Sequence, residues 1–204
     1  MKLYTSVGPN PRVVKMFLAE KGMTLPMIEV DIRGGENRKA PYTTANPAGQ
    51  SPALELDDGS VLAEITAICE YLDEVQPDPP LMGTTAEERA KTRMWIRRVD
   101  LKVCEPLANG FRFGEGLPMF QSRMRCLPEA SAGLKAIAKD GEAWLEEHLS
   151  GPWLAGERFT LADILLFGFI DFGNVVGQPL DPEFKRLNDW FGRVKARPSA
   201  VAST

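Results

Sequence analysis

Four side chains of the kinds that often do covalent or metal chemistry stand far apart in the sequence: Cys69, Cys104, Cys126 and His148. The three cysteines form no CxxC pair, and His148 is the only histidine. Zinc sites and disulfide frameworks need patterned Cys or His residues, and a His-based triad needs a histidine beside its nucleophile. These chemistries are therefore poorly supported, and we expect all four residues to be structural or solvated.

The predicted secondary structure differs between the two parts of the chain. Residues 1–76 alternate strand and helix patterns. A hairpin is predicted at Asp58–Gly59. The first helix is predicted to begin with Asn10 as N-cap and Pro11 at the first helical position. The other predicted elements are strands at 2–6, 27–30, 53–56 and 61–62, and helices ending at Lys21–Gly22 and running from Ile65 to Val75. A β-α-β unit followed by a hairpin and a helix gives a small mixed sheet, which is a thioredoxin-like arrangement.

Strand patterns vanish after the proline-rich segment at 77–84, which we interpret as an interdomain linker. A capping box at Thr84 or one residue later predicts a long helix to about Asn109, bent near Pro106. Further helices are predicted at 129–149, from Thr160–Asp163, and from Asp181–Pro182. The expected architecture is therefore α/β plus all-α, with a thioredoxin-like domain at 1–76 and a helical bundle at 85–204.

The amino-acid composition and net charge argue against nucleic-acid and membrane partners. The 204 residues carry a formal net charge of -4, with 44% hydrophobic and 25% charged residues and no basic block. That balance is typical of a globular protein and argues against nucleic-acid binding. The longest apolar run, Ile164 to Ile170, is far shorter than the ~20 residues that span a bilayer. No apolar stretch follows Lys2, so we expect no signal peptide, no membrane partner and a cytoplasmic location.

An ordered set of short motifs in both halves resembles the glutathione S-transferase family. In the first half they are Arg12-Val13, Glu20-Lys21-Gly22, Asn46-Pro47-Ala48-Gly49-Gln50-Ser51-Pro52-Ala53-Leu54, and Glu64-x-x-Ala67-Ile68-x-x-Tyr71-Leu72. In the second half the motif is Trp153-Leu154-Ala155-Gly156-x-x-Phe159-Thr160-Leu161-Ala162-Asp163. Each motif alone is weak, but the ordered set covers nearly the whole chain. The nearest resemblance is to a fungal and bacterial subgroup whose first helix starts Pro-Asn-Pro-Arg.

The resemblance implies that the first domain binds glutathione. Ser51 would precede a cis-proline, Pro52, and its backbone would pair with the cysteinyl part of glutathione as an added strand does. Gln50 would reach the γ-glutamyl or cysteinyl backbone. The implied glutathione-binding set is Lys39, Gln50, Ser51, Pro52, Glu64 and Ile65. The family places a Ser or Thr where this chain has Ile65, so one donor is lost, and the loss predicts weaker binding.

A glutathione transferase must favour the thiolate, because a thiol with a reference pKa of ~8.5 is mostly protonated at neutral pH. The turn from Ser6 to Arg12 is where donors would stand, and Ser6 and Asn10 are the catalytic candidates. The serine position usual in the family falls on Val7, one residue from Ser6, and Asn10 is also interpretable as a plain N-cap. The histidine that some members of the subgroup use is replaced here by Phe113.

The resemblance implies conjugation of glutathione to small hydrophobic electrophiles, with glutathione as co-substrate and no metal. Apolar candidates for the electrophile pocket are Val7, Phe111, Phe113, Met119 and Phe120. A two-fold homodimer is also implied. Two alternatives stay open: a non-catalytic binding or interaction module on the same fold, and a glutathione-dependent reductase or peroxidase. The reductase would need a cysteine in the Ser6–Asn10 turn, and none stands there.

Overall fold

The computed structural model describes residues 1–204, and the chain divides into two compact units. The first unit holds Met1–Leu81 together with Pro198–Thr204, and the second holds Met82–Arg197. The chain thus leaves the first unit after Leu81 and returns to it at Pro198. Each unit is described by itself below.

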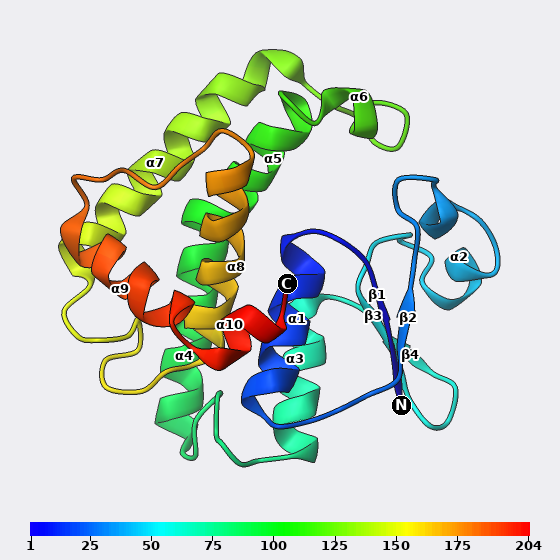
Figure 1. Cartoon of the computed structure of the whole chain (residues 1–204), viewed down its shortest axis with the longest axis horizontal. Coiled ribbons are helices and arrows are strands. Elements are labelled where there is room, and N and C mark those ends of the chain that lie inside the picture. Colours follow the sequence, from blue (N-terminus) through cyan, green and yellow to red (C-terminus); the bar gives the residue numbers. More distant parts are fainter. The chain divides into compact units, whose positions relative to one another are not determined.

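The first unit is a mixed four-stranded sheet with helices on both faces (Figure 1). Its elements are β1 (Lys2–Thr5), α1 (Pro9–Glu20), β2 (Met27–Glu29), η1 (Glu36–Arg38), α2 (Tyr42–Ala45), β3 (Ala53–Glu55), β4 (Val61–Leu62), α3 (Ile65–Val75) and α10 (Pro198–Ala202). The strand order is β2-β1-β3-β4; β1 pairs parallel with β2 and antiparallel with β3. This confirms the thioredoxin-like arrangement that the order of strand and helix patterns predicts.

The core of this unit lies between the sheet and the pair α1 and α3. Leu3 and Leu54 face each other across β1 and β3, and both are fully buried. Phe17 of α1 and Ile68 of α3 are fully buried as well, which fits helices that each carry one apolar stripe. A buried ion pair joins the end of α1 to α3, where the Lys21 ammonium lies 2.5 Å from the Asp73 carboxylate.

The second unit is entirely helical, as predicted from the loss of strand patterns. Its elements are α4 (Ala86–Val99), a π-helical segment (Asp100–Cys104), α5 (Glu105–Phe113), α6 (Leu117–Phe120), η3 (Pro128–Ala130), α7 (Ser131–His148), α8 (Leu161–Val175) and α9 (Lys185–Lys195). Helix α8 is buried on all sides from Leu161 to Ile170. Its capping box is present, with the Asp163 carboxylate accepting from the Thr160 backbone N–H at 2.9 Å. Buried Asp163 also accepts from the Leu154 N–H and the Trp190 indole N–H, so it joins three segments of the unit.

Two predicted helix starts are wrong, and for a third the structure selects one of the two predicted capping positions. Helix α1 begins at Pro9 with Gly8 as N-cap, so Asn10 is not the cap, because the chain turns into the helix two residues earlier. Asp181 caps no helix; its carboxylate accepts from the Glu183 N–H in a turn, and α9 begins only at Lys185. Helix α4 uses the later of the two possible boxes, with Thr85 accepting from the Glu88 N–H. No helix of the chain is long and apolar enough to cross a membrane.

Candidate functional site

Ser6 and Ser51, 45 residues apart in sequence, meet in the first unit. The Ser6 hydroxyl donates a hydrogen bond to the Ser51 hydroxyl at 2.9 Å, and only 3% of Ser6 is exposed. Ser6 follows the end of β1, and Ser51 stands just before β3, which is the neighbouring strand. The Ser51–Pro52 peptide bond is cis, as the resemblance implies. The turn after β1 and the loop before β3 thus form one polar site.

The loop that carries Gln50 and Ser51 is held by three side chains outside the predicted glutathione-binding set. The Gln50 carbonyl accepts from the Tyr42 hydroxyl at 2.5 Å and from the Asn46 side-chain amide at 2.7 Å. The Asn37 amide donates to the Gly49 carbonyl at 2.5 Å. Burial raises the pKa of Tyr42, so its hydroxyl stays a proton donor. The sequence gives little indication of these hydrogen bonds. Only the folded chain brings the Gly49 and Gln50 carbonyls within reach of these side chains.

The start of α3 carries two more of the predicted glutathione-binding residues, Glu64 and Ile65. Glu64 is the N-cap and the only non-glycine residue with a positive φ, 68°. Its side chain is exposed and caps nothing, and α3 begins at Ile65 without a side-chain cap. The first backbone N–H groups of such a helix have no partner inside the helix, and its dipole favours an anion there. This helix start suits a carboxylate of a bound molecule.

Two further predicted site residues are Asn10, in the first turn of α1, and Lys39, after η1. Asn10 is the second residue of α1 and makes no cap, so replacing it removes no capping energy. The interpretation of Asn10 as a plain N-cap is therefore wrong. Lys39 follows η1 and is exposed.

The residues predicted for an apolar pocket belong to both units. Val7 lies in the first unit, in the turn before α1, and 55% of it is exposed. The others lie in the second unit, in α5 and α6. Phe111 packs edge-on against Phe120, with ring centroids 6.2 Å apart. Phe113 is half-buried, and 36% of Met119 is exposed. Exposed apolar side chains are therefore available in each unit.

Cys69 lies in α3 of the first unit, and Cys104, Cys126 and His148 belong to the second unit. All three cysteines are free, and burial raises the pKa of Cys69 and of Cys104 well above the ordinary value, which keeps both thiols protonated. His148 stacks on Trp144 at 4.3 Å between ring centroids on the exposed side of α7. No group of three or more His, Cys, Asp or Glu side chains gathers in a way that could hold a metal ion.

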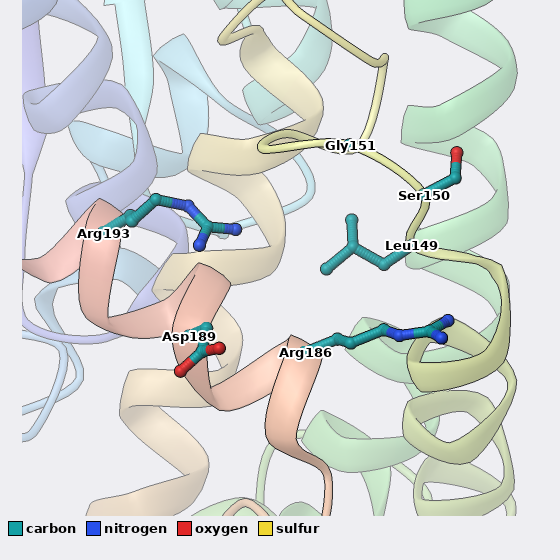
Figure 2. A pocket seen from close by; sticks show the side chains of 6 residues that line it. All are labelled: Leu149, Ser150, Gly151, Arg186, Asp189 and Arg193. Carbon is teal, nitrogen blue, oxygen red and sulfur yellow. The ribbon is translucent and has the colours of Figure 1, made fainter.

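A cleft of about 500 Å³ in the second unit contains none of the predicted site residues. Its lining residues are Leu149, Ser150, Gly151, Arg186, Asp189 and Arg193 (Figure 2). The three charged side chains are exposed, and Arg193 already donates to the Pro152 carbonyl at 3.0 Å. Arg186 and Arg193 are cations and Asp189 is an anion, so no small ion is attracted by all three, and each exposed ion pair contributes only about 0.2–1 kcal/mol. We assign no ligand to this cleft.

A second cleft, of about 590 Å³, lies in the first unit between α1, β2 and the last residues of the chain. It includes Thr5 and Lys15 but not Ser6, Ser51 or Glu64. The polar site at Ser6 is therefore separate from this cleft.

Family comparisons match both halves of the chain. Residues 7–75 match the model of the glutathione S-transferase N-terminal domain, and residues 116–198 match that of the C-terminal domain. A relative, glutathione S-transferase 2 of Saccharomyces cerevisiae, is 30% identical over 202 residues, covering 96% of this chain and 85% of the relative. The FtsZ-localized protein A of Caulobacter vibrioides is 30% identical over 203 residues, covering 94% and 85%.

A solved structure shows the same fold over the whole length. It is a glutathione S-transferase domain-containing protein of Marinobacter aquaeolei VT8, 36% identical, with a TM-score of 0.92 over 98% of this chain and 99% of that chain.

Proposed function

The chain belongs to the glutathione S-transferase family, and on that premise we propose that it conjugates glutathione to small hydrophobic electrophiles at the site around Ser6 and Ser51. The observation that carries the proposal is the contact of the two serine hydroxyls at 2.9 Å, beside the cis Ser51–Pro52 bond. The backbone of Ser51 pairs with the cysteinyl part of glutathione, which puts the sulfur next to Ser6. The γ-glutamyl carboxylate lies at the start of α3, where the Ile65 N–H donates. Gln50, Glu64 and Lys39 make the remaining polar contacts to glutathione.

The thiolate is stabilised in the turn from Ser6 to Asn10. Ser6 is our first candidate, because its hydroxyl is buried and contacts Ser51, whose backbone we propose binds the cysteinyl part. The uncapped start of α1 adds the helix dipole and the backbone N–H of Asn10 at the same turn, since Pro9 and Pro11 have no N–H. Lowering the thiol pKa by ~2 units requires ~2.7 kcal/mol of preferential stabilisation of the anion, which one hydroxyl donor and a helix start can supply.

We propose that the electrophile is a small apolar molecule; the candidate residues to contact it are Val7 in the first unit and, in the second unit, Phe111, Phe113, Met119 and Phe120. An apolar surface accepts such a molecule without hydrating the thiolate. We also propose that the protein acts in the cytoplasm, in detoxification, as a homodimer. Sedimentation that shows a monomer at micromolar concentration would contradict the dimer.

Titration calorimetry with glutathione, and with S-methylglutathione as an unreactive probe, tests the binding site. Glu64→Gln should weaken binding about tenfold, because it removes a carboxylate that faces the γ-glutamyl ammonium, a contact of ~1.5 kcal/mol. The matched control is Glu74→Gln, which removes an exposed carboxylate from the far end of the same helix. Equal loss in both variants, or no binding by the unaltered protein, would contradict the site.

Turnover of 1-chloro-2,4-dinitrobenzene separates a transferase from a second candidate, a non-catalytic binding or interaction module. Two observations favour this candidate: the Ser6 hydroxyl is already engaged with Ser51, and a relative carries a name for localization with FtsZ rather than for transfer. Glutathione binding with an unshifted thiol pKa and no turnover would establish the module. Binding with a lowered pKa and turnover would establish the transferase.

A further inference from the structure

The last residues of the chain pack on the helix that follows the proposed thiolate turn. Helix α10 contacts α1 within the first unit, and Figure 1 shows the two side by side. Ser199, Ala200 and Ser203 are all at least 95% buried there. Such burial in a segment this short indicates that specific contacts hold it against α1.

Two hydrogen bonds of Arg12 tie this segment to the first turn of α1. The Arg12 Nε donates to the Ser203 hydroxyl at 3.4 Å, and its Nη2 donates to the Ala200 carbonyl at 3.3 Å. The Ser203 hydroxyl itself donates to the same Ala200 carbonyl at 2.9 Å, so the three groups form a closed set. A second attachment lies at the far end of α1, where the Ser199 hydroxyl donates to the Glu20 carboxylate. Helix α10 therefore holds α1 at both ends.

The first turn of α1 needs such an attachment. Its N-cap is Gly8, which offers no side chain to the helix start. Arg12 is four residues after Gly8, and its N–H donates to the Gly8 carbonyl at 3.3 Å. Holding the Arg12 side chain therefore also holds the backbone from Ser6 to Gly8, where the thiolate donors stand. Donors that stabilise an anion act best when their geometry is fixed before the anion forms.

We propose that residues 198–204 clasp the thiolate turn, and that Arg12 is a positioning residue for the glutathione site. The inference rests on the proposed function for its catalytic meaning, although the clasp itself is a property of the first unit. Arg12 affects the thiolate only by fixing the Ser6–Gly8 backbone. The proposal requires no contact between its guanidinium and glutathione.

The test compares Arg12→Gln, Arg12→Lys and Ser203→Ala with a control, Val201→Ser. Val201 lies on the same short helix and is 70% exposed, so this control changes α10 without touching the clasp. The pKa of bound glutathione is followed by thiolate absorbance against pH, and amide hydrogen exchange is measured at Val7, Gly8 and Asn10. Arg12→Gln should raise that pKa by ~0.5–1 unit, a three- to tenfold fall in the ionisation constant of the bound thiol, and should speed exchange in the turn.

Ser203→Ala should produce about half of that pKa change, because one of the two attachments remains, and Val201→Ser should produce none. Arg12→Lys keeps the charge but loses the forked donor, so it should behave like Arg12→Gln. If Arg12 acted directly through its charge, the proposal would be wrong. In that case the pKa of bound glutathione in Arg12→Lys and in Ser203→Ala would equal that in the unaltered protein. Lower melting temperatures with unchanged pKa and exchange would also overturn it.

The proposed function can fail separately from the clasp. If the unaltered protein binds no glutathione, the transferase proposal is wrong. Amide exchange at the turn in Ser203→Ala, measured against Val201→Ser, then still decides whether the clasp orders this backbone.

Discussion

Replacing Ser6 by alanine should raise the pKa of bound glutathione while leaving its affinity nearly unchanged. In the free protein the Ser6 hydroxyl donates to Ser51, so stabilising the thiolate requires it to leave that partner. A hydrogen bond to an anion contributes ~1.5–3 kcal/mol, and the neutral bond that is given up contributes ~1 kcal/mol. The net effect is ~0.5–2 kcal/mol, which corresponds to a rise of ~0.4–1.5 pKa units.

The assay is the absorbance of the thiolate against pH for saturated complexes of the unaltered protein and Ser6→Ala. Ser60→Ala is the control, because Ser60 is an exposed hydroxyl in the β3–β4 turn. Circular dichroism melting should show that Ser6→Ala keeps the fold. A pKa unchanged within about 0.2 unit (~0.3 kcal/mol) would refute the role of Ser6 and leave the backbone N–H groups of the turn as the donors.

Three further predictions follow from the described contacts. Ile65→Ser should tighten glutathione binding about fivefold in calorimetry, because it adds a hydroxyl donor of ~1 kcal/mol at the start of α3; unchanged or weaker binding would place the γ-glutamyl group elsewhere. Cys126 should be the only thiol alkylated in the native protein at pH 8, since burial raises the pKa of Cys69 and Cys104, and mass spectrometry that finds either of these labelled before unfolding would contradict this. Lys21→Met should lower the free energy of unfolding by ~3–5 kcal/mol, because it removes the cation of a buried ion pair; a loss under 1 kcal/mol in urea titration would show that the pair is not needed.

Local patterns predicted most of the fold. The Asp58–Gly59 turn, the apolar stripe from Ile65 to Val75 and the Thr160–Asp163 box each lie within one element, so their spacing alone reveals that element. The start of α1 was misplaced because Pro9 and Pro11 both fit a first helical turn, and only the backbone at Gly8 decides between them.

The contacts that build the site could not be predicted in the same way. Ser6 and Ser51 are brought together by the pairing of β1 with β3, and the Gln50 carbonyl is held by Tyr42. The return of residues 198–204 to the first unit has no local signal, because it depends on Arg12 nearly two hundred residues earlier. The resemblance predicted the site residues, and the structure shows what holds the loops that carry them.

The most direct test of the central claim is the thiol pKa of glutathione bound to the unaltered protein. We expect saturable binding and a pKa near 6.5, ~2 units below that of the free thiol. A complex whose thiol still titrates near ~8.5, or the absence of any complex at millimolar glutathione, would contradict the claim that this site activates glutathione.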